Sequence, residues 1–595
     1  MSFHPNEVAR RGRLASVAVF ALFSILAGRF FMVQVLQYSD FVLRSERNRL
    51  SEVPLPAPRG IIFDRVGRII AENVPGYAVS ILVPSEDSLR ATLKRLGETI
   101  TITRQEGERA IRRYRATRGR PTIIFADASF ETVSRLEEYR ARFPGLIVQS
   151  SPKRWYPDSS IVSAFIGYTG EISEAQLELP RYTDYKAGDE IGRAGLESQY
   201  EAELRGREGS RFVEVDALGR VVRDAGVRAE QAPEAGPVLR TNIDMELQRF
   251  VANVFGDSMQ GAAVVMEPTT GAVLAIYSAP GFDPNRFTGG VSNAYYSELN
   301  TDPRKPLYNK AIQGAYDPGS TWKLATAIVA LENDLVTLDE TMAVPCNGGY
   351  TFGVRRWRCW KRDGIGHGRM SLREAIASSC DVYFYQLGLK IGLSRLVAGG
   401  RKMLFADRTG IDLPYEQASV FPTVPIEDYY TKKYGARGWT AGAAVLNMSI
   451  GQGENAQTVV NMARFYTALA NGGEATRPAI IAREPERTRI FRLDSTKLAA
   501  LTAAMADVVS SRGTAGSAAI QGVTFAGKTG TAQNAQDPTR DHAWFVGFAP
   551  AEKPRVVVSV MVEFGLHGYV AARLASKIAE AYLKIPVAVS QTDGE

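Results

Sequence analysis

The chain is organised around residues 316–332, which read YDPGSTWKLATAIVALE. The Asp-Pro-Gly run indicates a turn, and the apolar spacing after it is typical of a helix, so Ser320 is expected to open that helix. Ser320 and Lys323 then lie on one face of the first turn. A serine hydroxyl becomes a nucleophile when an adjacent base takes its proton, and a neutral lysine is such a base. Taken alone, the same spacing also fits a polar helix cap.

Two later motifs argue against a chance occurrence of the motif formed by Ser320 and Lys323. Residues 378–381 (SSCD) follow a helical run, and residues 528–531 (KTGT) follow an apolar run. Serine enzymes that recognise penicillin carry three such motifs in this chain order. The chain resembles a class B penicillin-binding protein of the elongation type, penicillin-binding protein 2. The resemblance covers nearly the whole chain and includes residues 59–65 (RGIIFDR), 195–197 (GLE) and 451–453 (GQG).

The resemblance implies a catalytic role for four residues. Ser320 is the expected nucleophile, and Lys323 is its expected base. Burial and a nearby cation both favour the neutral form of a lysine, and the resemblance makes Lys528 that cation. Ser379 is expected to relay a proton to the nitrogen of the leaving D-alanine.

The resemblance also implies a set of substrate-binding residues. Thr529 and Thr531 lie two apart, so on a strand both hydroxyls face one side and can hold the substrate carboxylate. The backbone N–H groups of Ser320 and Thr531 are expected to form the oxyanion hole, and Gly530 to allow close approach of the substrate. Asp381 stands where asparagine is general in the family, although the elongation type commonly carries aspartate. An ionised aspartate accepts hydrogen bonds but cannot donate one to a substrate.

The N-terminus predicts a membrane anchor. Residues 14–36 (LASVAVFALFSILAGRFFMVQVL) are long enough to cross a bilayer, with Arg29 as the one interruption. Arg10, Arg11 and Arg13 precede this stretch and are expected to keep the N-terminus in the cytoplasm. A cleaved signal peptide is the alternative, but the apolar run is too long and no small-residue cleavage site follows it. The expected location is therefore the bacterial inner membrane, with a single span and the catalytic domain in the periplasm.

Length and composition indicate several globular domains. The chain has 595 residues, of which 45% are apolar and 23% charged. Its formal charge of +7 is modest, and no basic block alternates with aromatic residues, so no nucleic-acid partner is expected.

The fold class is α/β (α+β). Residues 89–97, 104–118 and 130–143 have helical spacing and many charged residues, and the strand-like runs 525–531, 542–549 and 556–564 are expected to complete a mainly antiparallel catalytic sheet flanked by helices. The resemblance implies a mixed α and β pedestal before this sheet. The expected divisions are a cytoplasmic tail (1–13), the anchor (14–36), a non-catalytic, partner-binding pedestal domain (37–235), a transpeptidase domain (236–585) and a C-terminal tail (586–595).

The function implied by the resemblance is that of a peptidoglycan D,D-transpeptidase. Such an enzyme cross-links stem peptides during cell elongation, through a serine acyl-enzyme that β-lactam antibiotics also form. The implied partners are a membrane glycosyltransferase of the SEDS type and scaffold proteins of the elongation complex. The alternatives are a septal-type transpeptidase, a D,D-carboxypeptidase, a penicillin-sensing receptor and a non-catalytic scaffold of the wall-synthesis complex.

The three cysteines of the chain lie within one short span that also contains a histidine. Cys346, Cys359, His367 and Cys380 have the spacing C-x12-C-x7-H-x12-C. Three cysteines and a histidine are an accepted tetrahedral zinc set, so a structural zinc ion is predicted. Relatives of the elongation type that resemble this chain can hold a metal here. A disulfide between two of the cysteines and three unconnected buried thiols are the alternatives.

Overall fold

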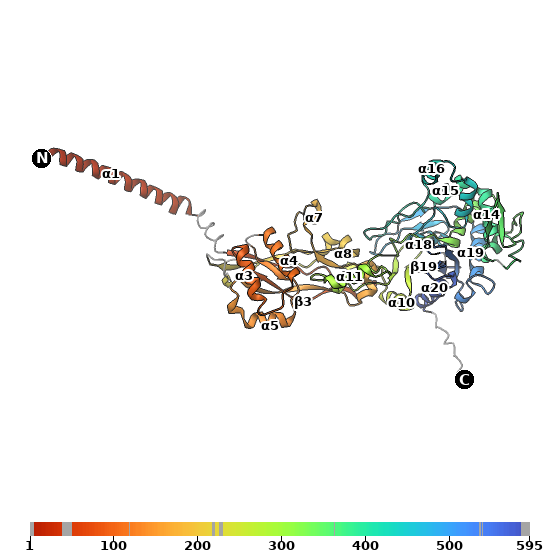
Figure 1. Ribbon diagram of the computed structural model, residues 1–595, viewed down its shortest axis with the longest axis horizontal. Coiled ribbons are helices and arrows are strands. Elements are labelled where there is room, and N and C mark those ends of the chain that lie inside the picture. The colour runs from red at the N-terminus through yellow and green to blue at the C-terminus, as the bar shows by residue number, and fades with distance from the viewer. Residues whose placement is uncertain are drawn as a thin grey trace, which may run out of the picture.

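The computed structural model describes residues 5–38, 50–117, 120–216, 221–224, 230–361, 363–534, 537 and 539–584. Figure 1 shows three parts in a row: an N-terminal helix, a slender middle part and a rounded C-terminal part. We use "middle part" for residues 50–240 and "C-terminal part" for residues 241–584. The mixed α and β architecture agrees with the fold class expected from the sequence. The expected tail at 586–595 lies outside the described residues.

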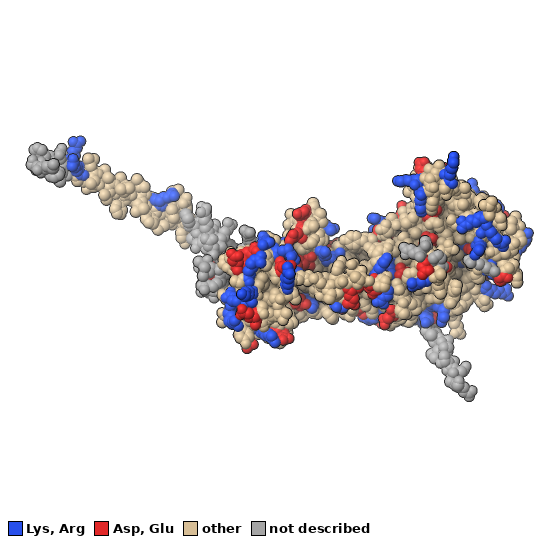
Figure 2. Space-filling model, in the orientation of Figure 1, with Lys and Arg blue, Asp and Glu red and all other residues tan. Residues whose placement is uncertain are grey.

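The N-terminal helix stands clear of the rest of the protein. Helix α1 (Pro5–Phe31) continues into a π-helical turn, η1 (Met32–Leu36). Within residues 9–36, the most apolar stretch of 18 residues has a mean hydropathy of 2.0, and none of it is buried inside the protein. Figure 2 shows basic side chains at the two ends of this helix and uncharged surface between them. In the part of the chain that the structure describes, it is the one helix long and apolar enough to span a membrane.

The middle part is built on one long strand. Strand β3 (Ile69–Ile81) pairs antiparallel with β5 (Leu146–Trp155) along ten residue pairs, from Glu72–Trp155 to Ile81–Leu146. It also pairs with β2 (Ile62–Phe63) and β4 (Thr122–Phe125). Strand β10 (Leu239–Arg240) joins this sheet beside β2. The sheet therefore includes residues after position 235, where the expected pedestal ends. The pairing of β2 with β10 thereby brings together residues from the beginning and the end of the middle part's sequence.

Three capped helices pack against the Ile81 end of β3 and the Leu146 end of β5. They are α3 (Glu86–Leu96), α4 (Arg104–Ala116) and α5 (Phe130–Glu138). Each begins after a side chain that accepts a hydrogen bond from the first helical turn, namely Ser85, Thr103 and Ser129. The apolar faces of the three helices form a core separate from that of the C-terminal part. The charged helical spacing in this region predicted these helices correctly.

The remaining elements of the middle part are short. A second sheet has the order β1 (Leu50–Leu55), β8 (Gly209–Val215) and β9 (Val221–Asp224). Strands β6 (Thr169–Glu171) and β7 (Glu190–Gly192) form a hairpin. The helical turns are η2 (Arg140–Arg142), η3 (Ser159–Val162), α6 (Ser163–Ile166), α7 (Glu174–Leu177), η4 (Pro180–Tyr182), α8 (Gly195–Gln199) and α9 (Glu201–Leu204).

The C-terminal part contains a five-stranded antiparallel sheet. Its order is β12 (Val273–Ala279), β11 (Gln260–Met266), β19 (Val556–Glu563), β18 (His542–Ala549) and β17 (Ala526–Ala532). Helices α10 (Met245–Phe255) and α20 (Gly568–Leu583) pack together on this sheet, and α18 (Val459–Ala470) also packs on its central strands. Apart from their ends, these strands are buried on both faces, which explains the near-continuous apolar sequences of β11, β12, β18 and β19. The expected completion of the sheet by strands from the end of the chain is confirmed.

Helices and hairpins fill the long stretch between the first and last strands of this sheet. The helices are α11 (Asn293–Thr301), α12 (Lys323–Glu332), α13 (Leu372–Ala377), α14 (Asp381–Ile391), α15 (Leu393–Lys402), α16 (Ile426–Tyr434), α17 (Ala441–Ser449) and α19 (Ser495–Val509). The hairpins are β13 (Gly349–Phe352) with β14 (Arg355–Arg358), and β15 (Glu474–Thr476) with β16 (Arg487–Arg489). The 3-10 turns are η5 (Pro284–Arg286), η6 (Gly319–Trp322) and η7 (Gly516–Ala518). Helix α12 is buried on all sides from Lys323 to Leu331 and forms the centre of this region.

Candidate active site

Ser320 lies in a tight turn pressed against strand β17. The turn is the 3-10 helix η6, and the α-helix begins only at Lys323, so Ser320 precedes the α-helix that it was expected to open. Gly319 has φ +52°, and a Cβ atom there would lie 2.6 Å from the carbonyl oxygen of Thr531. Only glycine fits both the left-handed backbone and this close approach. The first and third motifs are therefore in direct contact.

Lys323 points from α12 into the second motif. Its Nζ donates to the backbone oxygen of Ser379 at 2.9 Å and to the Asp381 carboxylate at 2.6 Å, and it lies 3.3 Å from the Ser379 hydroxyl. The side chain is completely buried. Lys323 therefore connects the helix that follows Ser320 to both polar residues of the second motif.

The Ser379 hydroxyl lies between two lysines. Besides Lys323, the Nζ of Lys528 lies 2.9 Å from the Ser379 Oγ, although the two residues are 149 positions apart. Ser379 sits between α13 and α14 with φ +57°, a left-handed conformation that costs energy for a residue with a side chain. This backbone directs the hydroxyl toward the two amines. All three motifs thus meet at Ser379, as the sequence motifs predicted.

The two lysines have different electrostatic surroundings. Lys528 is buried and bonds to the Ser379 hydroxyl and to the backbone oxygen of Thr529. Burial lowers the pKa of its amine well below the usual value, and the neighbouring Lys323 lowers the pKa further. The carboxylate of Asp381 pairs with Lys323, the other lysine. The structure therefore does not support the expectation that Lys528 is the cation of the pair.

Asp381 orients groups of the protein rather than facing outward. One carboxylate oxygen accepts from Lys323, and the other accepts from the backbone N–H of Trp360 at 3.0 Å. Burial raises the pKa of the Asp381 carboxyl, while Lys323 partly offsets the rise. The indole N–H of Trp360 donates in turn to the backbone oxygens of Ser378 and Ser379. Trp360 is thus a member of the site that the sequence motifs did not identify.

The third motif lies along β17. The Thr529 hydroxyl is buried and lies 2.6 Å from that of Thr514, whereas Thr531 is exposed at the strand end. A Cβ atom at Gly530 would lie 2.7 Å from the backbone oxygen of Pro318. Gly530 is therefore required by the turn that carries the nucleophile, a reason that differs from the close substrate approach expected from the sequence. Thr514 is a second residue that the motifs missed, because it lies outside them.

Asp317 is a third residue near the site to which the sequence motifs gave no part in catalysis or substrate binding. It lies directly before the turn of Ser320, where the sequence pattern explained it as a turn former. Burial, together with the neighbouring carboxylate of Glu454, raises the pKa of Asp317 to about 7. The preceding residue, Tyr316, donates to the carboxylate of Glu563 at 2.7 Å. The carboxylates of Glu454 and Glu563 thus lie beside the residues that lead into the turn of the nucleophile.

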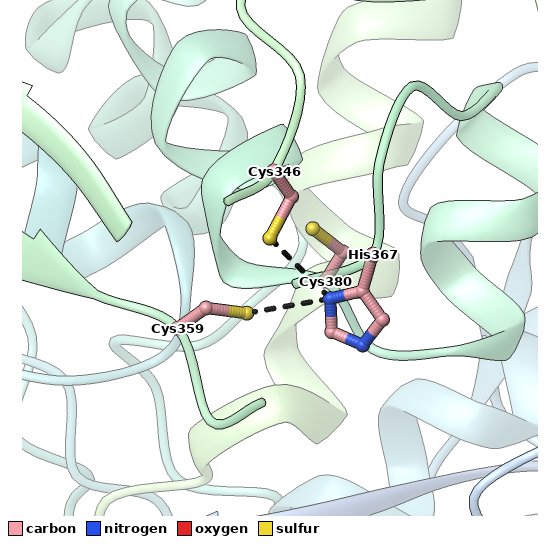
Figure 3. Close-up of side chains that lie close together, drawn as sticks. All are labelled: Cys346, Cys359, His367 and Cys380. Carbon is pink, nitrogen blue, oxygen red and sulfur yellow. Dashed lines mark hydrogen bonds between the residues drawn. The ribbon is translucent and has the colours of Figure 1, made fainter. Parts of the chain in front are cut away.

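The predicted zinc ligands gather beside the second motif. The ligand atoms of Cys346, Cys359, His367 and Cys380 all lie within 4.8 Å of one another (Figure 3). The Nδ1 atom of His367 is 3.5 Å from the Cys346 sulfur and 3.6 Å from the Cys359 sulfur. All three cysteines are buried and none forms a disulfide, which argues against the disulfide alternative. Cys346 precedes β13, Cys359 follows β14, and Cys380 comes directly after Ser379.

Two family models match the chain in the order of its two large parts. Residues 54–241 match the penicillin-binding protein dimerisation domain, and residues 261–583 match the penicillin-binding protein transpeptidase domain. The second match covers more than half of the chain and contains Ser320, Ser379 and Lys528.

Relatives with known names match the chain over almost its whole length. The peptidoglycan D,D-transpeptidase MrdA of Haemophilus influenzae is 31% identical, over 97% of this chain and 92% of its own length. Among solved structures, the penicillin-binding protein 2 of Helicobacter pylori in complex with MreC has a TM-score of 0.77 at 27% identity, covering 90% of this chain and 99% of that one. A chain from a peptidoglycan synthase complex that coordinates polymerization and crosslinking has a TM-score of 0.69 at 29% identity, covering 98% and 99%. The chain therefore belongs to the class B penicillin-binding proteins of the elongation type, the penicillin-binding protein 2 group of serine-type peptidoglycan D,D-transpeptidases.

Proposed function

We propose that this transpeptidase works through an acyl-enzyme on Ser320. The observation that carries the proposal is the hydrogen-bonded chain Lys323–Ser379–Lys528, which begins one turn after Ser320. Ser320 Oγ attacks the carbonyl carbon of the D-Ala-D-Ala peptide bond of a stem peptide and passes its proton to the Lys323 amine. The C–N bond then breaks, and the proton reaches the nitrogen of the departing D-alanine through the Ser379 hydroxyl.

The Lys323–Asp381 pair supplies the base. Lys323 donates to the Asp381 carboxylate at 2.6 Å, and transfer of this proton to the carboxylate leaves a neutral amine. Burial favours the protonated carboxyl of Asp381 and raises its pKa, which brings the form with a neutral lysine closer in energy. In that form Lys323 can accept the proton of Ser320. This role for Asp381 replaces the direct substrate contact expected from the sequence.

The third motif binds the substrate in this proposal. Thr531, exposed at the end of β17, holds the carboxylate of the substrate together with Thr529, whose hydroxyl Thr514 positions. The backbone N–H groups of Ser320 and Thr531 stabilise the oxyanion, which is supported by the contact between the turn of Ser320 and β17. Both groups are part of the backbone and are fixed before the substrate arrives.

Intact-mass analysis after exposure to benzylpenicillin tests the acyl-enzyme. The protein is expected to gain the mass of one β-lactam, and peptide mapping should place the adduct on Ser320. Ser320→Ala should give no adduct while its thermal unfolding stays unchanged. An adduct on Ser379 or on any other residue would overturn the assignment of the nucleophile.

We also propose that Cys346, Cys359, His367 and Cys380 hold a structural zinc ion. With zinc bond lengths of about 2.3 Å to sulfur and 2.0 Å to nitrogen, tetrahedral ligands lie about 3.5–3.8 Å apart. The distances from His367 to two of the sulfurs, 3.5 and 3.6 Å, fit this arrangement. Zinc would fix the loop of Trp360 against the second motif through Cys359 and Cys380. It would take no part in the transfer of the acyl group.

The anchor and the partners complete the proposal. The three arginines before the apolar stretch of α1 keep that end in the cytoplasm, so the C-terminal part works in the periplasm. The pedestal expected at residues 37–235 corresponds to the middle part, which extends to Arg240 because β10 belongs to its sheet. Because the structural neighbours are a complex with MreC and a peptidoglycan synthase complex, we assign this pedestal to contacts with an elongation scaffold and a SEDS-type glycosyltransferase.

A further inference from the structure

The hairpin beside the active site carries a concentration of positive charge. Residues 346–370 contain six lysines and arginines and one acidic residue, whereas the whole chain is nearly balanced, with 71 basic and 64 acidic residues. Arg355, Arg356 and Arg358 lie on strand β14, are exposed and have no ion-pair partner among the described residues. By contrast, exposed arginines elsewhere in the C-terminal part, such as Arg373 and Arg489, each bond to a carboxylate at 2.7 Å.

Alternate residues at the end of this hairpin face outward. From Arg356 to Trp360 the side chains alternate between exposed and buried: Trp357 and Cys359 are buried, and the other three are exposed. Residues two apart on an extended segment face the same side. Arg356, Arg358 and Trp360 therefore form a single exposed row, which we call the basic stripe.

The Trp360 end of the basic stripe contacts the second catalytic motif. The indole N–H of Trp360 donates to the backbone oxygen of Ser379 at 3.1 Å, and the Nζ of Lys323 donates to the same oxygen at 2.9 Å. The stripe therefore begins where the lysine base meets Ser379. Two residues of extended chain span at most about 7 Å, so the backbone of Arg358 lies within that distance of the backbone of Trp360.

Helix α14 fixes the backbone of the basic stripe. Its first residue, Asp381, accepts from the backbone N–H of Trp360 at 3.0 Å. Tyr385, one turn later on the same face, donates its hydroxyl to the backbone oxygen of Arg358 at 3.0 Å. The guanidinium group of Arg358 makes no hydrogen bond within the described chain. A cation with free donors is thus mounted on a backbone that the catalytic helix holds in place.

A peptide substrate can supply the missing carboxylate. The terminal carboxylate of D-Ala-D-Ala is assigned to Thr529 and Thr531 in the proposed function. The residue before D-Ala-D-Ala lies one D-alanine, about 4 Å of chain, from the reacting carbonyl, and its side chain extends farther. A guanidinium group binds a carboxylate through two parallel hydrogen bonds, which suits the unoccupied donors of Arg358.

We propose that Arg358 binds a free side-chain carboxylate on the residue that precedes D-Ala-D-Ala in the donor stem peptide. Arg356 adds positive potential beside it, while its Nη2 is held by the backbone oxygen of Asn347 at 3.1 Å. This inference rests on the proposed acyl-enzyme, because that enzyme places the peptide beside Ser379. The enzyme then prefers stem peptides with an acidic residue at this position over peptides in which the same side chain is amidated.

Acylation of the full-length protein in detergent by two peptide thioesters tests the proposal. Both are N-acetyl-2-aminoadipyl-D-alanine in thioester linkage to D-2-mercaptopropionate, and they differ only in whether the aminoadipate side-chain carboxylate is free or amidated. The thiol leaves in place of the terminal D-alanine, and intact mass gives the second-order rate of acylation. The free acid should react about tenfold faster, the effect of one charge-assisted pair. Because the arginines are exposed, this preference should shrink in about 1 M salt.

Three variants locate the preference. Arg358→Gln should bring the two rates within about twofold of each other, because the charge-assisted pair is lost. Arg356→Gln should keep part of the preference and serves as the second variant of the stripe. Arg395→Gln is the matched control, since Arg395 is exposed on α15 without an ion pair in the described chain and lies outside the stripe, and it should keep the full preference.

Equal rates for the two thioesters in the wild type would overturn the proposal, as would a preference that Arg358→Gln leaves intact. Inorganic pyrophosphate that binds through Arg358, with no preference between the thioesters, would assign the stripe to phosphate instead and would also overturn it. Acylation by neither thioester, in protein that benzylpenicillin still labels on Ser320, would overturn this inference alone. Absence of the penicillin adduct on Ser320 would overturn the acyl-enzyme proposal, so the two failures are distinguishable.

Discussion

Two buried clusters of basic and acidic side chains lie in different parts of the protein, and they use different cations. The cluster of the active site is built on Lys323 and Lys528, both completely buried. The cluster of the middle part is built on Arg59 and Arg154, which are 8% and 1% exposed. A buried lysine can give up its proton, whereas arginine stays protonated in proteins. The first cluster can therefore move protons, and the second keeps its charges fixed.

The carboxylates of the two clusters respond in opposite directions. Burial raises the pKa of the carboxyl of Asp381, and its lysine partner only partly offsets this. Burial also raises the pKa of Glu197, but the two arginines outweigh that effect, and its pKa falls below the usual value. Both groups are buried, so the difference comes from the number and kind of their cations. A carboxylate held by two guanidinium groups is a structural element, while one held by a lysine remains able to accept a proton.

The largest effect is expected from replacing Lys323. Lysine can lose its proton, whereas arginine in its place cannot. Lys323→Arg preserves the positive charge beside Asp381 but removes the base, and Lys323→Ala removes both. Both variants should acylate about a thousandfold more slowly, the contribution of a general base. The measurement is the second-order rate of labelling by a fluorescent penicillin.

Thermal unfolding serves as the control for these two variants, since both should remain folded. Lys528→Ala should weaken binding and acylation, and the double variant should be little slower than Lys323→Ala, because groups that act as a unit are not additive. Labelling of Lys323→Arg at a rate near that of the wild type would show that proton transfer does not pass through this residue.

The second-largest effect is expected on the unfolding free energy of the protein, from a substitution in the middle part. Glu197→Gln keeps the shape of the side chain but leaves Arg59 and Arg154 without their shared carboxylate. Breaking a buried ion pair on one side is expected to cost about 3–5 kcal/mol of unfolding free energy. Urea unfolding measures the loss, and the labelling rate per folded molecule should not change. A slower rate in the folded variant would mean that the two clusters are not independent.

A smaller effect is expected when the metal is removed from beside the active site. Protein purified without added zinc should contain one zinc per chain and no reactive thiol under native conditions. Chelation should expose three thiols. It should also slow the labelling of Ser320 about tenfold, the size expected when groups that orient a site are lost. Readdition of zinc should restore the rate, whereas magnesium should not. Metal-free protein that labels at full rate would contradict the proposal.

The smallest effect concerns acid stability. The folded pKa of Glu197 lies below its unfolded value of about 4.3. Its contribution to stability is therefore complete above about pH 4.3 and is lost as the pH falls toward the folded pKa. The wild type should lose unfolding free energy more steeply below about pH 4.5 than Glu197→Gln does. Parallel urea curves for the two proteins across this range would contradict the pKa direction.

The sequence predicted the meeting of the motifs but not their charges. Ser320, Ser379 and Lys528 lie far apart in the chain, and three motifs in a known order were sufficient to bring them together. Which lysine has the carboxylate partner depends on burial and on distances of a few ångströms, which no spacing encodes. The resemblance implied that Lys528 is the cation, while the structure places the carboxylate of Asp381 on Lys323.

The elements of the fold were predictable to a similar degree. Long apolar and helical runs gave the strands of the catalytic sheet and the helices of the middle part. Trp360 and Thr514 were missed because each reaches a motif from a separate loop. The cluster around Glu197 was missed because Arg59 and Arg154 come from positions 138 and 43 residues away in the chain. Contacts of this kind follow from the tertiary fold and leave no local pattern.

The two glycines that join the nucleophile turn to β17 have a consequence for antibiotic resistance. A methyl group at Gly319 or Gly530 would collide with the opposite backbone and push the two apart. That displacement would harm the natural substrate as much as the drug, since both react at the same serine. Resistant forms of this enzyme are thus expected to keep both glycines and to change at residues outside the contact between the turn of Ser320 and β17.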